Sequence, residues 1–146
     1  MLYLLDSNIL LYSKIEDSPE YHLTSEWLTD TLAGPSNTVV ICETSILAFL
    51  RIGTNPRIFN PPLPIEQARE FVEDLLARPN VQIFQPSFKI YTELLDNMEN
   101  LNLRGDMTMD AHLATIALRL GAILVTRDAD FGKFNYLKKF NPLEDR

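Results

Sequence analysis

The sequence is poor in cysteine, histidine and basic residues, and each shortage excludes a class of protein. A single cysteine, Cys42, allows no internal disulfide, as expected of a protein kept in a reducing compartment. The two histidines, His22 and His112, provide no zinc-binding pattern. With 20 acidic and 13 basic residues, the net charge of −7 argues against broad binding of phosphate backbones by a basic surface.

Long apolar runs and glycine-rich loops are also missing. No segment approaches the ~18 uninterrupted apolar residues of a membrane span. The apolar start of the chain lacks the basic leading region of a signal peptide, and Asp6 interrupts it. We therefore expect a cytoplasmic protein without membrane contact. Neither a P-loop nor a dinucleotide-binding glycine pattern is present.

What the sequence does contain is an alternation of short apolar strands and helices. Its 146 residues have the length of one domain, and 46% of them are hydrophobic, which suffices for one core. The patterns predict strands at 2–5, 38–41, 81–84, 122–125 and 138–140, and helices at 8–15, 19–32, 42–52, 65–77, 88–100 and 107–120. Segment 54–64 contains four prolines and is predicted to be irregular. This order predicts a single α/β domain over residues 1–146, a three-layer α/β/α sandwich with a mainly parallel sheet of four to five strands.

Acidic residues follow three of the predicted strands. Asp6 ends the first strand, Glu43 comes two residues after the second, and Asp128 and Asp130 follow the fourth. The carboxyl ends of parallel strands share one edge of the sheet, where ligands bind in such folds. Asp110 lies in the first turn of helix 107–120, on a face of small and apolar residues, where a carboxylate needs a partner. The pattern favours one shared acidic site.

Each acid also has an ordinary structural explanation. Asp6 could cap the helix that follows it, and Glu43 and Asp110 could interact with helix dipoles. Asp128 and Asp130 could be turn residues. Because helix starts lie at the same edge of the sheet, capping alone could gather acids there. If the acids do form one site, their repulsion requires a divalent cation, and oxygen ligands favour Mg²⁺ or Mn²⁺.

Four stretches resemble the motifs of the PIN-domain nucleases, in that family's order and spacing. They are LLDSNILLY, ICETSILAFLRI, MTMDAHLATIALRLG and LVTRDADF, and together they cover nearly the whole chain. FLRIGTNPRIF further resembles a subgroup of the VapC toxins of bacterial toxin–antitoxin pairs. The resemblance implies Mg²⁺- or Mn²⁺-dependent hydrolysis of RNA phosphodiester bonds, inhibition by a VapB antitoxin, and a homodimer.

The resemblance also implies a role for each acid. The four acids of the family match Asp6, Glu43, Asp110 and Asp128, which are the expected catalytic residues. Of these, Asp6, Asp110 and Asp128 are the expected metal ligands, directly or through water. Every one of the family's main acids is present, so nothing in the sequence indicates an inactive member of the family.

Five further residues match supporting or binding positions. Ser7, Asn8 and Thr126 match polar positions near the site, although many relatives have Thr where Ser7 stands. Asp130 matches a second acid often seen before the phenylalanine of the last motif. Arg51 lies in the subgroup signature and is the expected RNA-binding residue, although it could also interact with the dipole at the end of its helix.

Other interpretations stay open. The chain could be a PIN nuclease that acts on RNA processing or on DNA, or a binding module whose acids are only caps. A phosphotransfer receiver would need a lysine after a later strand, and none follows the strands that carry the acids. Arg57, Arg104 and Arg127 are further RNA-binding candidates, and Arg127 could instead pair with an acid. The apolar residues of 42–63 could line a partner groove, although core packing is favoured.

Overall fold

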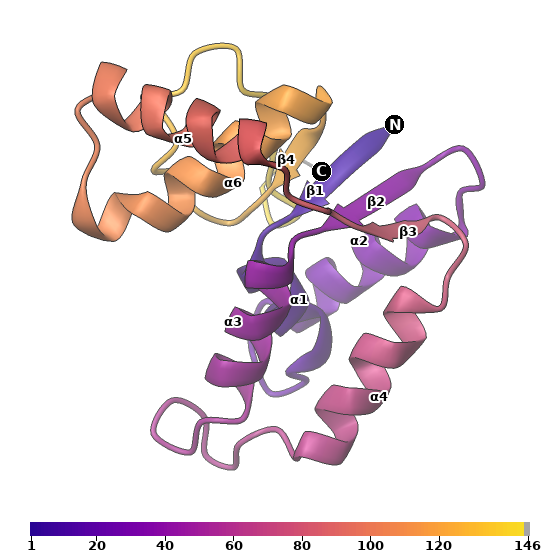
Figure 1. Ribbon diagram of the computed structural model, residues 1–146. Helices are drawn as coiled ribbons and strands as arrows, with labels where there is room; N and C mark the ends of the chain where they lie inside the picture. The colour runs from indigo at the N-terminus through magenta and orange to yellow at the C-terminus, as the bar shows by residue number, and fades with distance from the viewer. Residues whose placement is uncertain (145–146) are drawn as a thin grey trace.

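The computed structural model describes residues 1–144, in which a five-stranded parallel sheet lies between two layers of helices (Figure 1). The strands are β1 (Leu2–Leu5), β2 (Thr38–Ile41), β3 (Val81–Ile83), β4 (Ile123–Val125) and β5 (Lys139–Phe140). Their spatial order is β3-β2-β1-β4-β5, and every neighbouring pair is parallel. The chain runs from β1 through β2 to β3 on one side of β1 and then crosses to β4 and β5 on the other side. The strand order therefore reverses between β1 and β4, and a crevice forms beyond their ends.

Two helices lie between successive strands from β1 to β4, and β5 follows β4 without a helix between them. They are α1 (Ser7–Lys14), α2 (Tyr21–Ala33), α3 (Glu43–Gly53), α4 (Ile65–Leu76), α5 (Phe88–Asn100) and α6 (Thr108–Leu120), with a short 3-10 turn at Gly105–Met107. In Figure 1, α5 and α6 lie on one side of the sheet and α1 to α4 on the other. Each of the two helical layers thus has its own face of the sheet to cover.

The two faces of the sheet carry separate apolar cores. Leu4 and Leu124 belong to the core under α5 and α6, together with residues such as Ile116. The next residue of each strand, Leu5 and Val125, belongs to the core shared with α1 to α4. This alternation is the two-residue period of a strand buried on both faces. The predicted three-layer α/β/α sandwich is confirmed.

The predicted strands at 2–5 and 38–41 and the predicted helix at 88–100 have the observed bounds. The prediction that α2 begins at Pro19 is wrong by two residues, because Pro19 lies in a turn closed by a 3.1 Å hydrogen bond from the Tyr21 amide to the Ser18 carbonyl. The fourth strand begins at Ile123 and not at 122. Gly121 adopts φ +64°, and the amide of Ala122 donates to the carbonyl of Ala117 at 2.9 Å, so residue 122 completes the cap of α6.

Segment 54–64 contains no helix or strand, as predicted. Of the apolar residues near it, Phe49 is fully buried in the core while Ile58 is half exposed, so the core-packing interpretation holds for Phe49. Within residues 1–144, no helix has the length and apolar character needed to cross a bilayer.

Candidate active site

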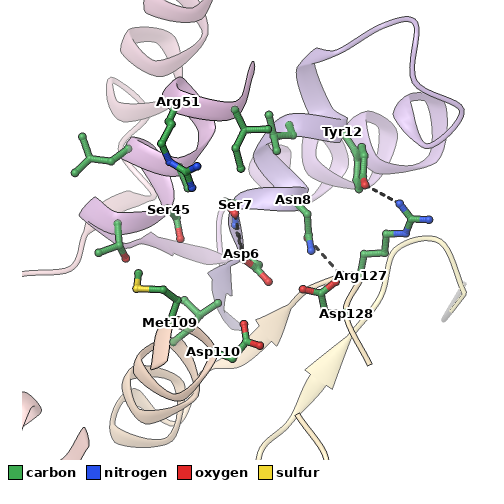
Figure 2. A pocket seen from close by; sticks show the side chains of 16 residues that line it. Asp6, Ser7, Asn8, Tyr12, Ser45, Arg51, Met109, Asp110, Arg127 and Asp128 are labelled. Carbon is green, nitrogen blue, oxygen red and sulfur yellow. Dashed lines mark hydrogen bonds between the residues drawn. The ribbon is translucent and has the colours of Figure 1, made fainter. Parts of the chain in front are cut away.

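A cavity of about 860 Å³ opens at the carboxyl edge of the sheet, where β1 and β4 end (Figure 2). Its walls come from α1, α3, the first turn of α6 and residues 127–128. Three of the predicted acids line it, and Figure 2 shows their side chains on different walls: Asp6 after β1, Asp110 on α6 and Asp128 after β4. The fold thus brings together residues that are more than 100 positions apart in sequence.

Asp6 is held on both of its carboxylate oxygens. It is the N-cap residue of α1, and its Oδ1 accepts a hydrogen bond of 2.7 Å from the Ser7 amide. Its Oδ2 accepts a hydrogen bond of 2.7 Å from the hydroxyl of Thr126. The capping interpretation of Asp6 is therefore correct, and it does not compete with a place in the cavity, which the same carboxylate lines.

The Thr126 hydroxyl organises this end of the cavity. It is 2% exposed, and it accepts hydrogen bonds from the Asp128 amide at 3.0 Å and from the Asn8 side-chain amide at 3.5 Å. A hydroxyl has one hydrogen to donate and two lone pairs. Thr126 gives its hydrogen to Asp6 and uses both lone pairs, so its orientation is fixed. Asn8 and Ser7 also line the cavity, while the supporting functions predicted for them stay predictions.

The acids of the cavity influence one another's ionisation. Burial raises the pKa of Asp6, the hydrogen bonds from Thr126 and Ser7 oppose this shift, and the charge of Asp128 adds to it. Burial also raises the pKa of Asp110, and the charges of Asp6, Asp128 and Asp130 raise it further. The four aspartates therefore form one electrostatic site whose members repel each other.

The donor chemistry of this site fits a divalent cation. None of the ion pairs among residues 1–144 involves Asp6, Asp110, Asp128 or Asp130. Across the described chain, no three acidic, histidine or cysteine side chains converge closely enough to enclose a metal. The carboxylates line one cavity without meeting at a point, and as like charges they repel one another. Such an all-oxygen set suits a hard cation.

Glu43 and Asp130 lie apart from the three aspartates of the cavity. Glu43 is exposed as the first residue of α3 and is not part of the cavity lining, although the next residues, Thr44 and Ser45, are. Asp130 is exposed, and its charge reaches Asp110. The metal-binding and catalytic assignments stay predictions for all of these acids.

Two arginines line the cavity in different states. Arg51 is exposed on α3 and forms no ion pair with any residue in the described part of the chain. Arg127 pairs with Glu20, with an N–O distance of 2.9 Å, and donates a 2.6 Å hydrogen bond to the hydroxyl of Tyr12. The alternative that Arg127 pairs with an acid is thus confirmed.

Tyr12 and Ser45 are site residues that the sequence analysis did not identify. Ser45 is buried, lines the cavity and donates a 3.3 Å hydrogen bond to the carbonyl of Leu5, which ties α3 to the end of β1. Tyr12 lies four residues after Asn8, on the same face of α1, and this spacing is a signal that could have identified it. Nothing in the local sequence distinguishes Ser45.

The cysteine and the histidine near the site have ordinary structural roles. Cys42 is 2% exposed, and burial, with a smaller contribution from the charge of Asp6, raises its pKa to about 12. Such a thiol is protonated and inert, and Cys42 serves as a small buried residue of the core. Burial also lowers the pKa of His112, which keeps that side chain neutral.

A family model described as PIN domain matches residues 3–135. The chain belongs to the PIN domain family. Curated PIN relatives include Ribonuclease VapC37 of Mycobacterium tuberculosis, 32% identical over 140 residues that cover 95% of this chain and 96% of that protein. Ribonuclease VapC33 of the same species is 29% identical, with 96% and 97% covered.

Solved structures give the same fold. The VapBC2 complex of Rickettsia felis, bound to a DNA fragment from its promoter, contains a chain that is 26% identical and aligns with a TM-score of 0.64 over 97% of this PIN chain and 98% of that one. A chain of VapBC-1 from nontypeable Haemophilus influenzae aligns with a TM-score of 0.67 at 20% identity, over 99% and 100% of the two chains. This second likeness concerns the fold alone.

Proposed function

We propose that the protein is the ribonuclease toxin of a VapBC toxin–antitoxin pair, which hydrolyses RNA phosphodiester bonds and is neutralised by a VapB-type antitoxin. The observation that carries the proposal is the cavity that Asp6, Asp110 and Asp128 line at the β1 and β4 exits of a PIN fold. The names of its relatives, ribonucleases of the VapC type, support the activity. The VapBC2 complex among the structural neighbours supports the antitoxin partner.

In this proposal Asp6, Asp110 and Asp128 hold Mg²⁺ or Mn²⁺, directly or through water. A bound divalent cation lowers the pKa of a water molecule and stabilises negative charge on phosphoryl oxygens. The hydrogen bond that Thr126 donates orients the carboxylate of Asp6 and opposes the rise of its pKa on burial. The cation also offsets the repulsion that raises the pKa of Asp110.

The remaining predicted residues support the reaction from the rim. Glu43 completes the catalytic acids from the start of α3, with less support than the aspartates because it is exposed and outside the cavity lining. Asp130 adds negative charge near Asp110, and Ser7 and Asn8 support the end of β1. Arg51 binds an RNA phosphate, since it lines the cavity as an exposed cation.

We also propose that the protein is a cytoplasmic homodimer. Helix α5 exposes Phe88, Tyr91 and Leu95 at 85%, 51% and 65%, and these residues follow one another at helical spacing. An exposed apolar stripe of this kind suits a self-complementary interface. Leu95→Glu should convert the dimer to a monomer in light-scattering measurements, while Ile65→Glu, at an exposed position on α4, should not.

The cytoplasmic location rests on the single cysteine. The one buried thiol, Cys42, suits a reducing compartment.

The proposal is tested by RNA cleavage with purified protein and added Mn²⁺ or Mg²⁺. Cleavage should stop when the cation is chelated, and Asp6→Asn should reduce kcat by roughly 10²–10³-fold, the range found when one electrostatic catalytic group is lost. Asparagine remains a good N-cap, so circular dichroism should show an intact fold. Metal-dependent cleavage at the wild-type rate by Asp6→Asn would contradict the assignment.

A further inference from the structure

We propose that Arg127 is a positioning residue. Its contacts with Tyr12 and Glu20 hold segment 126–128 against α1, and this fixes the direction in which the carboxylate of Asp128 points toward the other acids. The inference deepens the proposed function and rests on it, since it assumes that the aspartates of the cavity bind a divalent cation. Arg127, Tyr12 and Asp128 all line the cavity.

The contacts of Arg127 join three parts of the chain. Its backbone amide donates to Oδ1 of Asn8 at 3.3 Å. Its guanidinium donates to the hydroxyl of Tyr12 at 2.6 Å, lies 5.3 Å from the centroid of that ring, and pairs with Glu20 at 2.9 Å. Asn8 and Tyr12 are one turn apart on α1, and Glu20 is the cap residue at the start of α2. Figure 2 shows the side chain of Arg127 reaching Tyr12.

The residues on either side of Arg127 explain why this anchoring matters. Thr126 is fixed through its hydroxyl, and the amide of Asp128 binds the same hydroxyl at 3.0 Å. The carboxylate of Asp128 accepts no side-chain hydrogen bond from any described residue, and it is exposed. Its charge acts on Asp6 and Asp110 and is repelled by them. The direction of Asp128 therefore depends on the backbone of segment 126–128, which Arg127 ties to α1.

The partners of Arg127 distinguish it from a residue that binds substrate. Glu20 is only 17% exposed, and it neutralises the charge of an arginine side chain that is 46% exposed. A phosphate would have to compete with this acid and with the Tyr12 hydroxyl. Arg51 has no such partner among the described residues and remains available for RNA. Because a half-exposed ion pair contributes little to stability, its loss should affect geometry more than folding.

Variants of the two anchors test this inference while the charge of Arg127 is kept. Tyr12→Phe and Glu20→Gln should each weaken Mn²⁺ binding about tenfold, measured from the electron paramagnetic resonance signal of free Mn²⁺, and lower kcat with KM for RNA unchanged. Tm should fall by less than about 4 °C. Arg127→Lys should resemble Arg127→Met, because Nη1 of Arg127 contacts both anchors and the shorter lysine side chain does not reach its position. An ammonium also lacks the planar guanidinium that lies near the Tyr12 ring.

The matched control is the Arg69–Glu73 pair, an exposed ion pair on α4 that is not part of the cavity lining. Glu73→Gln should leave both Mn²⁺ affinity and kcat at wild-type values. If Tyr12→Phe and Glu20→Gln keep wild-type Mn²⁺ affinity while Arg127→Met raises KM for RNA, Arg127 binds substrate and the inference is wrong. Large losses of Tm without a change in Mn²⁺ affinity would also overturn it. Wild-type protein that binds no Mn²⁺ would overturn the proposed function, and this inference with it.

Discussion

The two long walls of the cavity differ in how firmly they are held. The α1 wall, formed by Asp6, Asn8, Tyr12 and segment 126–128, is connected by hydrogen bonds between side chains of α1 and residues that follow β4. The α3 wall, formed by Thr44, Ser45, Leu47, Ala48, Arg51 and Ile52, is apolar at Leu47, Ala48 and Ile52, and its Leu47 is 56% exposed. Only Ser45 ties this wall to the sheet by a side-chain hydrogen bond in the described chain.

This difference indicates that the two walls have different functions. Electrostatic catalysis depends on charged groups that are already oriented before the substrate arrives, and the α1 wall meets that condition. A surface that binds a long polymer or a partner protein gains from exposed apolar area and free cations, which the α3 wall offers. We therefore expect substitutions on the α1 wall to lower kcat, and substitutions on the α3 wall to change binding.

The largest effect of the series is expected for Thr126→Val on the α1 wall. Valine matches the shape of threonine but removes the donor to Asp6 and leaves the Asp128 amide and Asn8 without their acceptor. We expect kcat to fall roughly 10–100-fold, the range for groups that orient metal ligands. Thr126→Ser should retain most of the activity because it keeps the hydroxyl. Equal kcat for the valine and serine variants would show that the network does not orient the site.

A smaller effect, on binding, is expected for Arg51→Met on the α3 wall. Losing one charged hydrogen bond to phosphate should raise KM for RNA about tenfold while kcat is kept. The plot of log(kcat/KM) against the logarithm of the salt concentration should also become less steep. Its slope should change by about 0.7, the value for one phosphate contact on a single strand. Arg57→Met, at an exposed arginine that is not part of the cavity lining, is the control. A fall in kcat at constant KM would place Arg51 in the chemical step.

Glu43→Gln should have a smaller effect than Thr126→Val, because Glu43 is exposed at the start of α3 and lies outside the cavity lining. We expect kcat to fall by less than about tenfold. Glu66→Gln removes another acid from the first turn of a helix, and it controls for the loss of a favourable charge near a helix dipole. A loss as large as that of Asp6→Asn would show that Glu43 belongs among the direct metal ligands.

The contrast between Asp6 and Glu43 shows what the sequence could predict. The strands were predictable because apolar runs of four residues bounded by polar ones have few alternatives, and parallel strands place Asp6 and Asp128 at one edge. The direction of the Glu43 side chain depends on the rotation of α3 against the sheet, which no local pattern encodes. The ion pair between Arg127 and Glu20 likewise depends on how α2 packs in the fold, because the two residues are more than 100 positions apart in the sequence.

The smallest effect concerns the stability of the metal-free protein. The pKa of Asp110 is raised in the folded state above the ordinary value of 3.8, so folding favours its protonated form. Its contribution to stability is therefore present below pH 3.8 and is lost as pH rises through the folded pKa. Asp110→Asn should raise Tm slightly at pH 7 in the presence of a chelator.

The pH profile of this stability difference provides the check. The Tm of Asp110→Asn and that of the wild type should converge below the ordinary pKa of an aspartate, where both states of the wild type are protonated. Adding Mn²⁺ should reverse the order at pH 7, because only the wild type then gains from binding the cation with its full set of acids. A variant that is less stable than the metal-free wild type at pH 7 would contradict the repulsion described for this site.

The hydrogen bond between Asp6 and Thr126 spans 120 positions of the chain. During translation the first half of the site emerges early, whereas the second half emerges only after β4 has been made. A partly synthesised chain therefore has α1 and its capping aspartate, and it lacks Thr126, Arg127 and Asp128. The active site of this nuclease is therefore incomplete until most of its messenger RNA has been translated.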